Sequence, residues 1–158
     1  MAKKKDKPDG PTIENRRARF DYAISDEIEV GIILKGSEVK AVRQSLISLA
    51  EGYVRVQDNP PQIELYNVLI GDYGPAAAMG HKPVRPRGLL AHKQQILKLF
   101  RQVQVKGMTI VPLKLYFKNG YAKLLIGLGK GKTKHDRRES IATREAKREM
   151  DRATSRRR

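Results

Sequence analysis

The sequence contains no cysteine and no tryptophan. Without cysteine the chain can form no disulfide bond, no cysteine-ligated zinc site and no thiol nucleophile, which is compatible with a reducing cytosol. It also lacks a run of about 18 apolar residues, and its N-terminus, Met1-Ala2 followed by lysines, lacks the apolar stretch of a secretory signal. We therefore expect a cytoplasmic protein without a membrane span.

Acidic residues are also scarce, with 17 Asp and Glu against 33 Lys and Arg, a net charge of +16 over 158 residues. Much of this charge is terminal, because residues 1–19 have seven basic and three acidic side chains and residues 130–158 have twelve and five. A compact chain of this charge repels itself unless salt or a polyanion screens it. Nucleic acid or an anionic membrane is therefore the expected partner.

The chain is long enough for one domain. Residues 1–12 combine Lys, Asp, Pro and Gly without an apolar period, which predicts a disordered basic arm. Residues 13–130 are predicted to form the folded body. In residues 131–158, helical spacing aligns only a thin apolar stripe, formed by Ala142, Ala146, Met150 and Ala153. So little apolar surface predicts a tail that is disordered when free and helical against a polyanion.

The body is predicted to be mainly β. Strands are expected at 19–24 and 28–34, around the polar turn 25–27, and at 53–57 and 63–70, around two prolines. Val39, Val42 and Leu46 have the spacing of a short helix that exposes Lys40 and Arg43.

Residues 71–87 predict a long loop ending in a basic run, and 89–105 predict a second helix. Alternating apolar residues on both sides of Asn119-Gly120 predict a tight hairpin. We therefore expect a closed antiparallel barrel of the oligonucleotide-binding (OB) type, with flanking helices and a basic C-terminal tail.

No motif indicates catalysis. Residues 127–133 (GLGKGKT) resemble a phosphate-binding loop, but Ile126 stands where that motif needs its first glycine. The glycines either let the backbone approach a phosphate or provide a flexible exit from the barrel. His81, His92 and His135 fall in different predicted elements, so we expect no metal site, no cofactor and no enzymatic activity.

Two basic clusters remain, at 15–19 (NRRAR) and 130–138 (KGKTKHDRR). Either one alone is usually a solvated face. Because both flank the predicted barrel, and because Tyr22, Tyr53, Tyr66 and Tyr116 fall on predicted strands, a phosphate-binding surface is favoured. The tyrosines could instead belong to the core.

The ordered motifs resemble the small protein B family, the tmRNA-binding proteins of bacterial trans-translation. The resemblance is carried by 15–19 through Tyr22, 29–32 (EVGI), 36–43 (GSEVKAVR), 83–90 (PVRPRGLL), 113–120 (LKLYFKNG), 129–132 (GKGK) and 136–138 (DRR). The chain departs from the family's pattern at Gly88, Ala91, Thr133 and Arg137. Chance agreement over so many ordered segments is implausible.

The resemblance implies a six-stranded OB-type barrel that holds the tRNA-like domain of tmRNA. It also implies a tail that follows the empty mRNA channel of a stalled ribosome to the 16S rRNA decoding centre. On this basis we expect RNA contacts from Asn15, Arg16, Arg17, Arg19, Glu29, Glu38, Lys40, Arg43, Arg85, Arg87, Leu90, Lys130, Lys132 and Lys134. Decoding-centre contacts are expected from Asp136, Arg137 and Arg138, and we expect the protein to act as a monomer.

Two alternatives explain part of the pattern. A ribosomal protein with basic ends accounts for the charge but not for the order of the motifs. An RNA-processing enzyme using Glu38 or His135 is less well supported, because carboxylates in basic proteins are usually engaged in salt bridges or helix caps.

Overall fold

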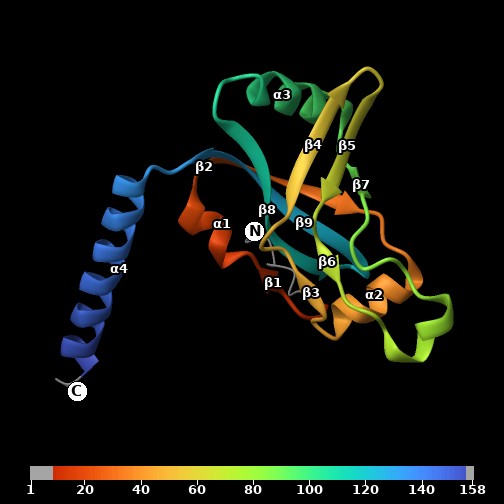
Figure 1. Ribbon diagram of the computed structural model, residues 1–158, viewed down its shortest axis with the longest axis horizontal. Helices are drawn as coiled ribbons and strands as arrows, with labels where there is room; N and C mark the ends of the chain where they lie inside the picture. Colours follow the sequence, from red (N-terminus) through yellow and green to blue (C-terminus); the bar gives the residue numbers. More distant parts are fainter. Residues whose placement is uncertain (1–8, 156–158) are drawn as a thin grey trace, which may run out of the picture.

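The computed structural model describes residues 9–155, which form a mainly β body with short helices and one long C-terminal helix (Figure 1). The predictions for residues 1–8 and 156–158 fall outside the described residues. The strands are β1 (Ile13–Glu14), β2 (Tyr22–Ile32), β3 (Ile47–Ser48), β4 (Tyr53–Asp58), β5 (Pro61–Tyr66), β6 (Leu69–Ile70), β7 (Arg87–Leu90), β8 (Met108–Lys118) and β9 (Tyr121–Gly131). The helices are α1 (Arg16–Asp21), α2 (Gly36–Arg43), the 3-10 helix η1 (Gly74–Met79), α3 (Lys93–Val103) and α4 (Lys134–Ser155).

Six strands pair in a closed ring. The order is β8-β4-β5-β7-β2-β9, and β9 pairs again with β8, all antiparallel. β1 adds to β8 outside the ring, and β3 and β6 form a separate two-stranded sheet. Alternate residues point inward along the strands, so Leu65, Leu115 and Leu124 are fully buried in the main core. α3 covers this core near β4 and β5 with Ile96 and Leu99 (Figure 1).

The predicted hairpin is confirmed. β8 and β9 pair up to Lys118 and Tyr121, and the two turn residues Asn119 and Gly120 have φ of 51° and 76°. Positive φ at both positions is the geometry that an Asn-Gly turn provides. The hairpin also holds the start of the described chain, because the Asp9 backbone N–H donates to the Phe117 carbonyl at 3.1 Å and the Gly120 backbone N–H donates to the Asp9 carboxylate at 3.0 Å. At least from Asp9, the predicted disordered arm is therefore attached to the body.

The first predicted strand is half confirmed, because residues 19–21 belong to α1 whereas residues 22–24 begin β2. The predicted turn at 25–27 was wrong, because β2 runs through it with a bulge between Ile24 and Asp26. α1 forms because the Asn15 side-chain oxygen accepts the Ala18 backbone N–H at 3.1 Å, a helix N-cap. The bulge absorbs the polar residues while β2 keeps its pairing with β9.

The second predicted helix begins later than expected. Residues 87–90 form the strand β7 instead, and α3 starts at Lys93, where the His92 backbone N–H donates to the Gln95 side chain at 3.1 Å. The predicted strand 63–70 is also interrupted, since Asn67 adopts φ of 55° between β5 and β6. The predicted long loop contains η1.

A buried ion cluster connects α2, the long loop and β7. Glu38 and Arg87 are fully buried, and Arg87 Nε lies 2.9 Å from Glu38 Oε1. Arg85 Nη2 lies 2.6 Å from Glu38 Oε2, and the Lys35 backbone N–H donates to the same oxygen at 2.7 Å. Arg87 also donates to the carbonyl of Val68 at 2.8 Å. Every charged group in the cluster therefore has partners, as burial requires.

The cluster keeps Glu38 ionised. Burial alone would raise the pKa of Glu38, but the hydrogen bonds from Arg85 and the Lys35 backbone, together with the charges of Arg87 and Arg85, hold that pKa below its ordinary value. A carboxylate with a lowered pKa stabilises the fold above its unfolded pKa, and this contribution is lost as the pH falls through the folded pKa.

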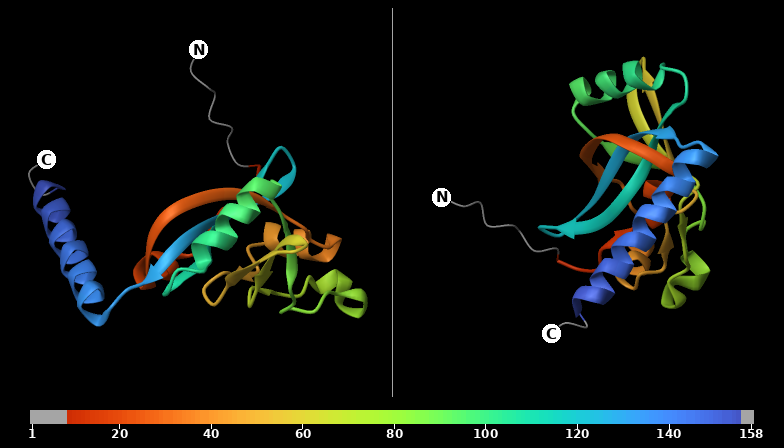
Figure 2. Two further views of the ribbon diagram at one scale, coloured as in Figure 1. Left: turned by 90° about the horizontal axis from the view of Figure 1, so that it is seen from above. Right: turned by 90° about the vertical axis from the view of Figure 1, so that its left-hand side faces the viewer.

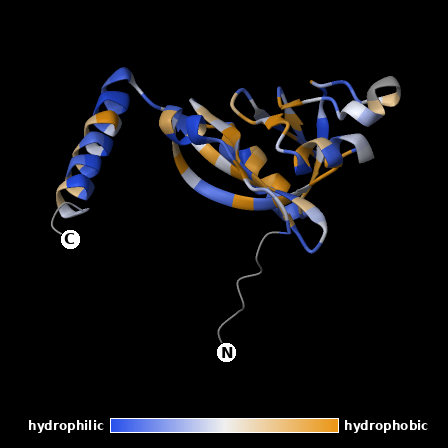
Figure 3. Cartoon of the chain, turned by 90° about the horizontal axis from the view of Figure 1, so that it is seen from below, coloured by the Kyte–Doolittle hydropathy of each residue, from blue (hydrophilic) through white to orange (hydrophobic). Residues whose placement is uncertain are grey.

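The tail helix α4 projects from the body (Figure 2) and buries none of its described side chains. Figure 3 shows a largely hydrophilic α4 beside a body whose strands carry hydrophobic residues. Within residues 9–155, no helix has the length and apolar character needed to cross a membrane.

We predict that Glu38→Gln lowers the free energy of unfolding by about 3 kcal/mol, because it leaves two guanidinium groups without their carboxylate. Urea unfolding measures this change. Glu51→Gln is the matched control, because the Glu51 side chain is 71% exposed although it pairs with Arg17. It should change stability by less than about 0.5 kcal/mol.

Below pH 4.5, the ordinary glutamate pKa, wild type should lose more stability than Glu38→Gln. Equal losses would contradict the assignment of ionised Glu38.

Candidate nucleic-acid interface

Two of the predicted RNA contacts, Glu29 and Leu90, line one hollow of about 410 Å³ on the outside of the ring. Leu90 on β7 lies opposite Gly31 on β2 and is 60% exposed, an unusual position for a large apolar side chain. A Cβ at Gly31 would lie 3.2 Å from the Leu90 Cβ, so the glycine leaves room for Leu90. The remaining lining residues are Ala91, His92, Gln95 and Lys123. The hollow therefore combines an apolar anchor with groups of both charges.

The Glu29 carboxylate is held from β8, the strand on the far side of β9. Tyr116 on β8 donates its hydroxyl to Glu29 Oε2. Burial and this contact raise the pKa of Tyr116 to about 12. The contact fixes the carboxylate at the edge of the hollow.

Asn15 lies elsewhere and is 5% exposed. Its side-chain N–H groups donate to the carbonyls of Leu49 and Pro112, each at 2.9 Å, while its oxygen caps α1. All of its polar atoms are therefore engaged within the protein. The structure gives Asn15 the role of fixing α1 against β8 and does not bring it to Glu29 and Leu90.

Glu38 and Arg87 are also inaccessible. Both are fully buried in the ion cluster described above, and the Arg85 side chain is 22% exposed. A contact between RNA and either buried residue does not fit this arrangement, because a ligand on the surface cannot reach them. In this structure Glu38 and Arg87 hold α2 against the end of the long loop.

Lys40 and Arg43 lie on the outer face of α2. The Lys40 ammonium is 5.2 Å from the centre of the Tyr73 ring, and the Arg43 guanidinium is 4.3 Å from that of Phe117. These cation–π contacts orient the two side chains without neutralising their charges. Both residues remain exposed and available to an anion.

The fold brings the two basic clusters together, because Tyr22 after α1 pairs with Gly131 at the end of β9. Arg16, Arg17 and Arg19 are exposed on α1. Arg17 pairs with Asp21 at 3.2 Å and with Glu51, and Arg19 pairs with Glu27 at 2.8 Å. Of the three, Arg16 has no acidic partner in the part of the chain that the structure describes.

The start of α4 is tied to α1. Lys132 Nζ donates to the Arg19 carbonyl and to Ser140 Oγ, both at 3.2 Å, and Arg137 lies 3.5 Å from Asp21. Lys130, Lys134 and Arg138 are exposed around this junction. The predicted clusters therefore form one continuous basic region.

Asp136 caps α4. Its carboxylate accepts the Thr133 backbone N–H at 2.9 Å and the Thr133 hydroxyl at 2.8 Å, and the Asp136 backbone N–H lies 3.3 Å from that hydroxyl. These bonds lower the pKa of Asp136, with the backbone bond contributing most. Thr133 thus begins the helix in a capping box.

His135 has two carboxylate neighbours on α4. One ligand atom each from His135, Asp136 and Glu139 can lie within 4.8 Å of the others. All three are exposed, and Asp136 already serves as the cap. We assign no metal role to them.

The predicted tyrosines fall in different environments. Tyr53 and Tyr66 stack with their centres 5.5 Å apart, and Arg55 lies 5.0 Å from the Tyr66 ring. Tyr22 packs on a small second core formed by Ala18, Val111 and Leu113.

Sequence reasoning did not identify Lys123 or His92 as part of the hollow, because their placement depends on the pairing of β2 with β7 and β9.

Comparison with known proteins agrees with these motifs. The family described as "SmpB protein" matches residues 12–156. An SsrA-binding protein of an Exiguobacterium species is 48% identical, covering 97% of this chain and 96% of the relative. One of Thermobifida fusca is also 48% identical, covering 99% and 98%.

A solved structure, described as "tmRNA-SmpB: a journey to the center of the bacterial ribosome", is also similar. It matches with a TM-score of 0.67 and 40% identity, over 84% of this chain and 95% of that chain. Since the family match spans most of the sequence and the relatives align nearly end to end, the chain belongs to the SmpB protein family.

Proposed function

We propose that this chain binds tmRNA and acts with it on stalled ribosomes in trans-translation. The observation that carries the proposal is near-full-length similarity to SsrA-binding proteins and to a tmRNA-SmpB structure. The exposed Leu90 beside Glu29 and the continuous basic region at α1 and α4 support it. We place the protein in the cytoplasm with its RNA partners and assign it a binding role without catalysis.

In this proposal, the six-stranded ring is a closed barrel of the OB type, and the body holds the tRNA-like domain. Recognition is by shape, because the hollow offers one apolar anchor and a few polar groups rather than a set of base-reading pairs. The exposed cations of α2 and α1 contact phosphates around it. The tail, including Asp136, Arg137 and Arg138, meets the decoding centre and the mRNA channel, where it becomes ordered.

Leu90→Ala tests the hollow. Truncating an exposed apolar anchor should weaken tmRNA binding by about fivefold to tenfold, the loss of about 1 kcal/mol or more typical of an interface anchor. Fluorescence anisotropy with labelled tmRNA measures the affinity. Val105→Ala is the control, because Val105 is similarly exposed, at 62%, and does not line the hollow. Equal loss in both variants, or none in Leu90→Ala, would remove the hollow from the interface.

Lys40→Ala and Arg43→Ala test the phosphate contacts of α2. Each lost contact should reduce the slope of log affinity against log salt by about 0.7 to 0.9. Lys98→Ala is the control on α3, because Lys98 is 62% exposed and 3.8 Å from Asp26. Its slope should equal that of wild type. Unchanged slopes for both α2 variants would place α2 outside the interface.

Deletion of α4 tests the division between body and tail. The truncated chain should keep Thr133 as its last residue. The Lys132 backbone N–H donates to the Asp21 carbonyl, so Lys132 belongs to the body. We expect tmRNA affinity within about twofold of wild type and loss of peptide tagging on stalled ribosomes, since separate segments would meet the two RNAs. Joint loss of binding and tagging would refute that division.

A further inference from the structure

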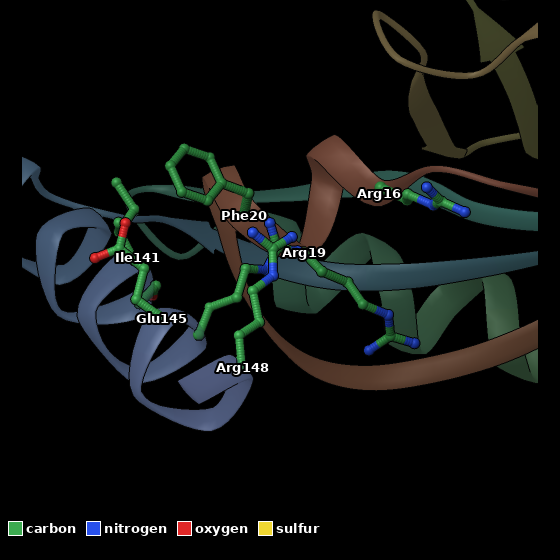
Figure 4. A pocket seen from close by; sticks show the side chains of 8 residues that line it. Arg16, Arg19, Phe20, Ile141, Glu145 and Arg148 are labelled. Atoms are coloured by element: carbon green, nitrogen blue, oxygen red, sulfur yellow. The ribbon is translucent and has the colours of Figure 1, made fainter. Parts of the chain in front are cut away.

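A cavity of about 260 Å³ separates α1 from α4, and arginines from both helices line it. Figure 4 shows Arg19 and Phe20 on α1 and Ile141 and Arg148 on α4 around the same space, with Arg148 extending toward α1. Arg16 and Arg144 complete the cationic lining, with Glu145 as the one acidic residue there. Four arginines thus line one volume, with the Arg16 and Arg19 side chains extending along the body away from α4 in Figure 4.

The face of α4 toward α1 is cationic. Arg137, Ile141, Arg144 and Arg148 follow one another at spacings of four, three and four, which places them on one side of a helix. Ile141 remains 43% exposed, so little apolar burial holds the two helices together. Like charges at i and i+4, such as Arg144 and Arg148, destabilise a helix in the absence of a counter-ion.

Most of these arginines are not neutralised within the protein. In the range 9–155, Arg16, Arg144 and Arg148 form no ion pair, and only Arg19 has one, with Glu27. A cavity lined by uncompensated guanidinium groups fits a ligand with acidic oxygens. The planar fork of arginine matches phosphate oxygens in particular.

The cationic lining continues beyond this cavity. A second hollow of about 270 Å³ shares Arg16, Arg19 and Arg144 and extends along β8 to Lys114. Lys114 pairs with Glu14 at 3.6 Å, so the guanidinium groups remain the main uncompensated charges. An extended ligand with repeated negative charges fits two adjoining hollows better than a single small anion does.

We propose that the groove between α1 and α4 binds the phosphates of an RNA strand, and that this binding fixes the orientation of the tail helix. Two arginines of the body and two of the tail would contact successive phosphates of the same strand. Without the strand, the arginines of α1 and α4 repel one another. When the strand is bound, both sets of arginines are attracted to its phosphates, and this attraction holds α4 against α1. The inference deepens the proposed function and rests on it only for the source of the phosphates.

Arg148→Glu tests the groove in the full-length protein. The probes are a fluorescent single-stranded RNA homopolymer and inorganic tripolyphosphate, which distinguish a strand site from a site for any polyphosphate. We expect Arg148→Glu to weaken binding by about fivefold or more, and Arg148→Lys to retain only part of the wild-type affinity, because an ammonium keeps the charge but lacks the planar fork. Lys147→Glu is the matched control, because it makes the same charge change on α4 and does not line the cavity.

The outcomes separate the groove from general charge attraction. A loss of homopolymer binding confined to Arg148→Glu supports the proposal, whereas a protein that binds tripolyphosphate but not the homopolymer has no strand site and overturns it. Equal losses in Arg148→Glu and Lys147→Glu, or no loss in either, overturn it. Circular dichroism of both variants verifies that α4 is equally helical, so that any difference in binding reports the groove.

A distance measurement tests the effect on the tail. Because the chain has no cysteine, Tyr121→Cys and Met150→Cys introduce two label sites, at positions 72% and 65% exposed. The distribution of distances between two spin labels should narrow when the RNA homopolymer is added, and Arg148→Glu should abolish the narrowing. An unchanged distribution in the otherwise wild-type chain would overturn the orienting role.

This test is separable from that of the proposed function. If tmRNA binds no better than other folded RNAs while the homopolymer still orients α4, the proposed function fails and the groove stands. If tmRNA is selected but Arg148→Glu behaves like Lys147→Glu, the groove fails and the proposed function stands.

Discussion

The position of the exposed hollow around Leu90 depends on a carboxylate that is buried inside the body. Glu38 binds the guanidinium groups of Arg85 and Arg87 in the interior. Arg87 is the first residue of β7, the short strand that closes the ring between β5 and β2 and carries Leu90. The hydrogen bonds of Arg87 to Val68 and Pro83 also fix the path of the preceding loop. The buried contact of Glu38 with the two arginines therefore determines where Leu90 reaches the surface.

Local patterns in the sequence predicted the elements that local interactions determine. The β8–β9 hairpin follows from Asn119-Gly120, and α2 follows from the spacing of Val39 and Val42. α1 could not be predicted in this way, because its cap, Asn15, is positioned by the distant Leu49 and Pro112. β7 and α3 follow one another so closely that the apolar residues of both fit a single helical period.

The candidate site was predictable in part for a related reason. A sequence shows that a residue is charged but not whether a partner buries that charge. Arg43 and Arg87 therefore looked equivalent, although one is exposed and the other fully buried. On α4 the search for apolar residues identified a stripe through Ala142 and Ala146, whereas the side facing α1 is lined by arginines. That arginines of two helices line one cavity can be recognised only once the packing of the helices is known.

The capping box at Thr133 and Asp136 bears on how the tail would order. Starting a helix is unfavourable because several backbone dihedrals are fixed for a single hydrogen bond, whereas each added residue then contributes a bond. In this chain the first turn of α4 is already supported by its cap, and the second by the contact of Lys132 with Ser140. Coil-to-helix conversion would thus start beside the folded body and propagate outward, so that the helix would grow in one direction only, toward the C-terminus.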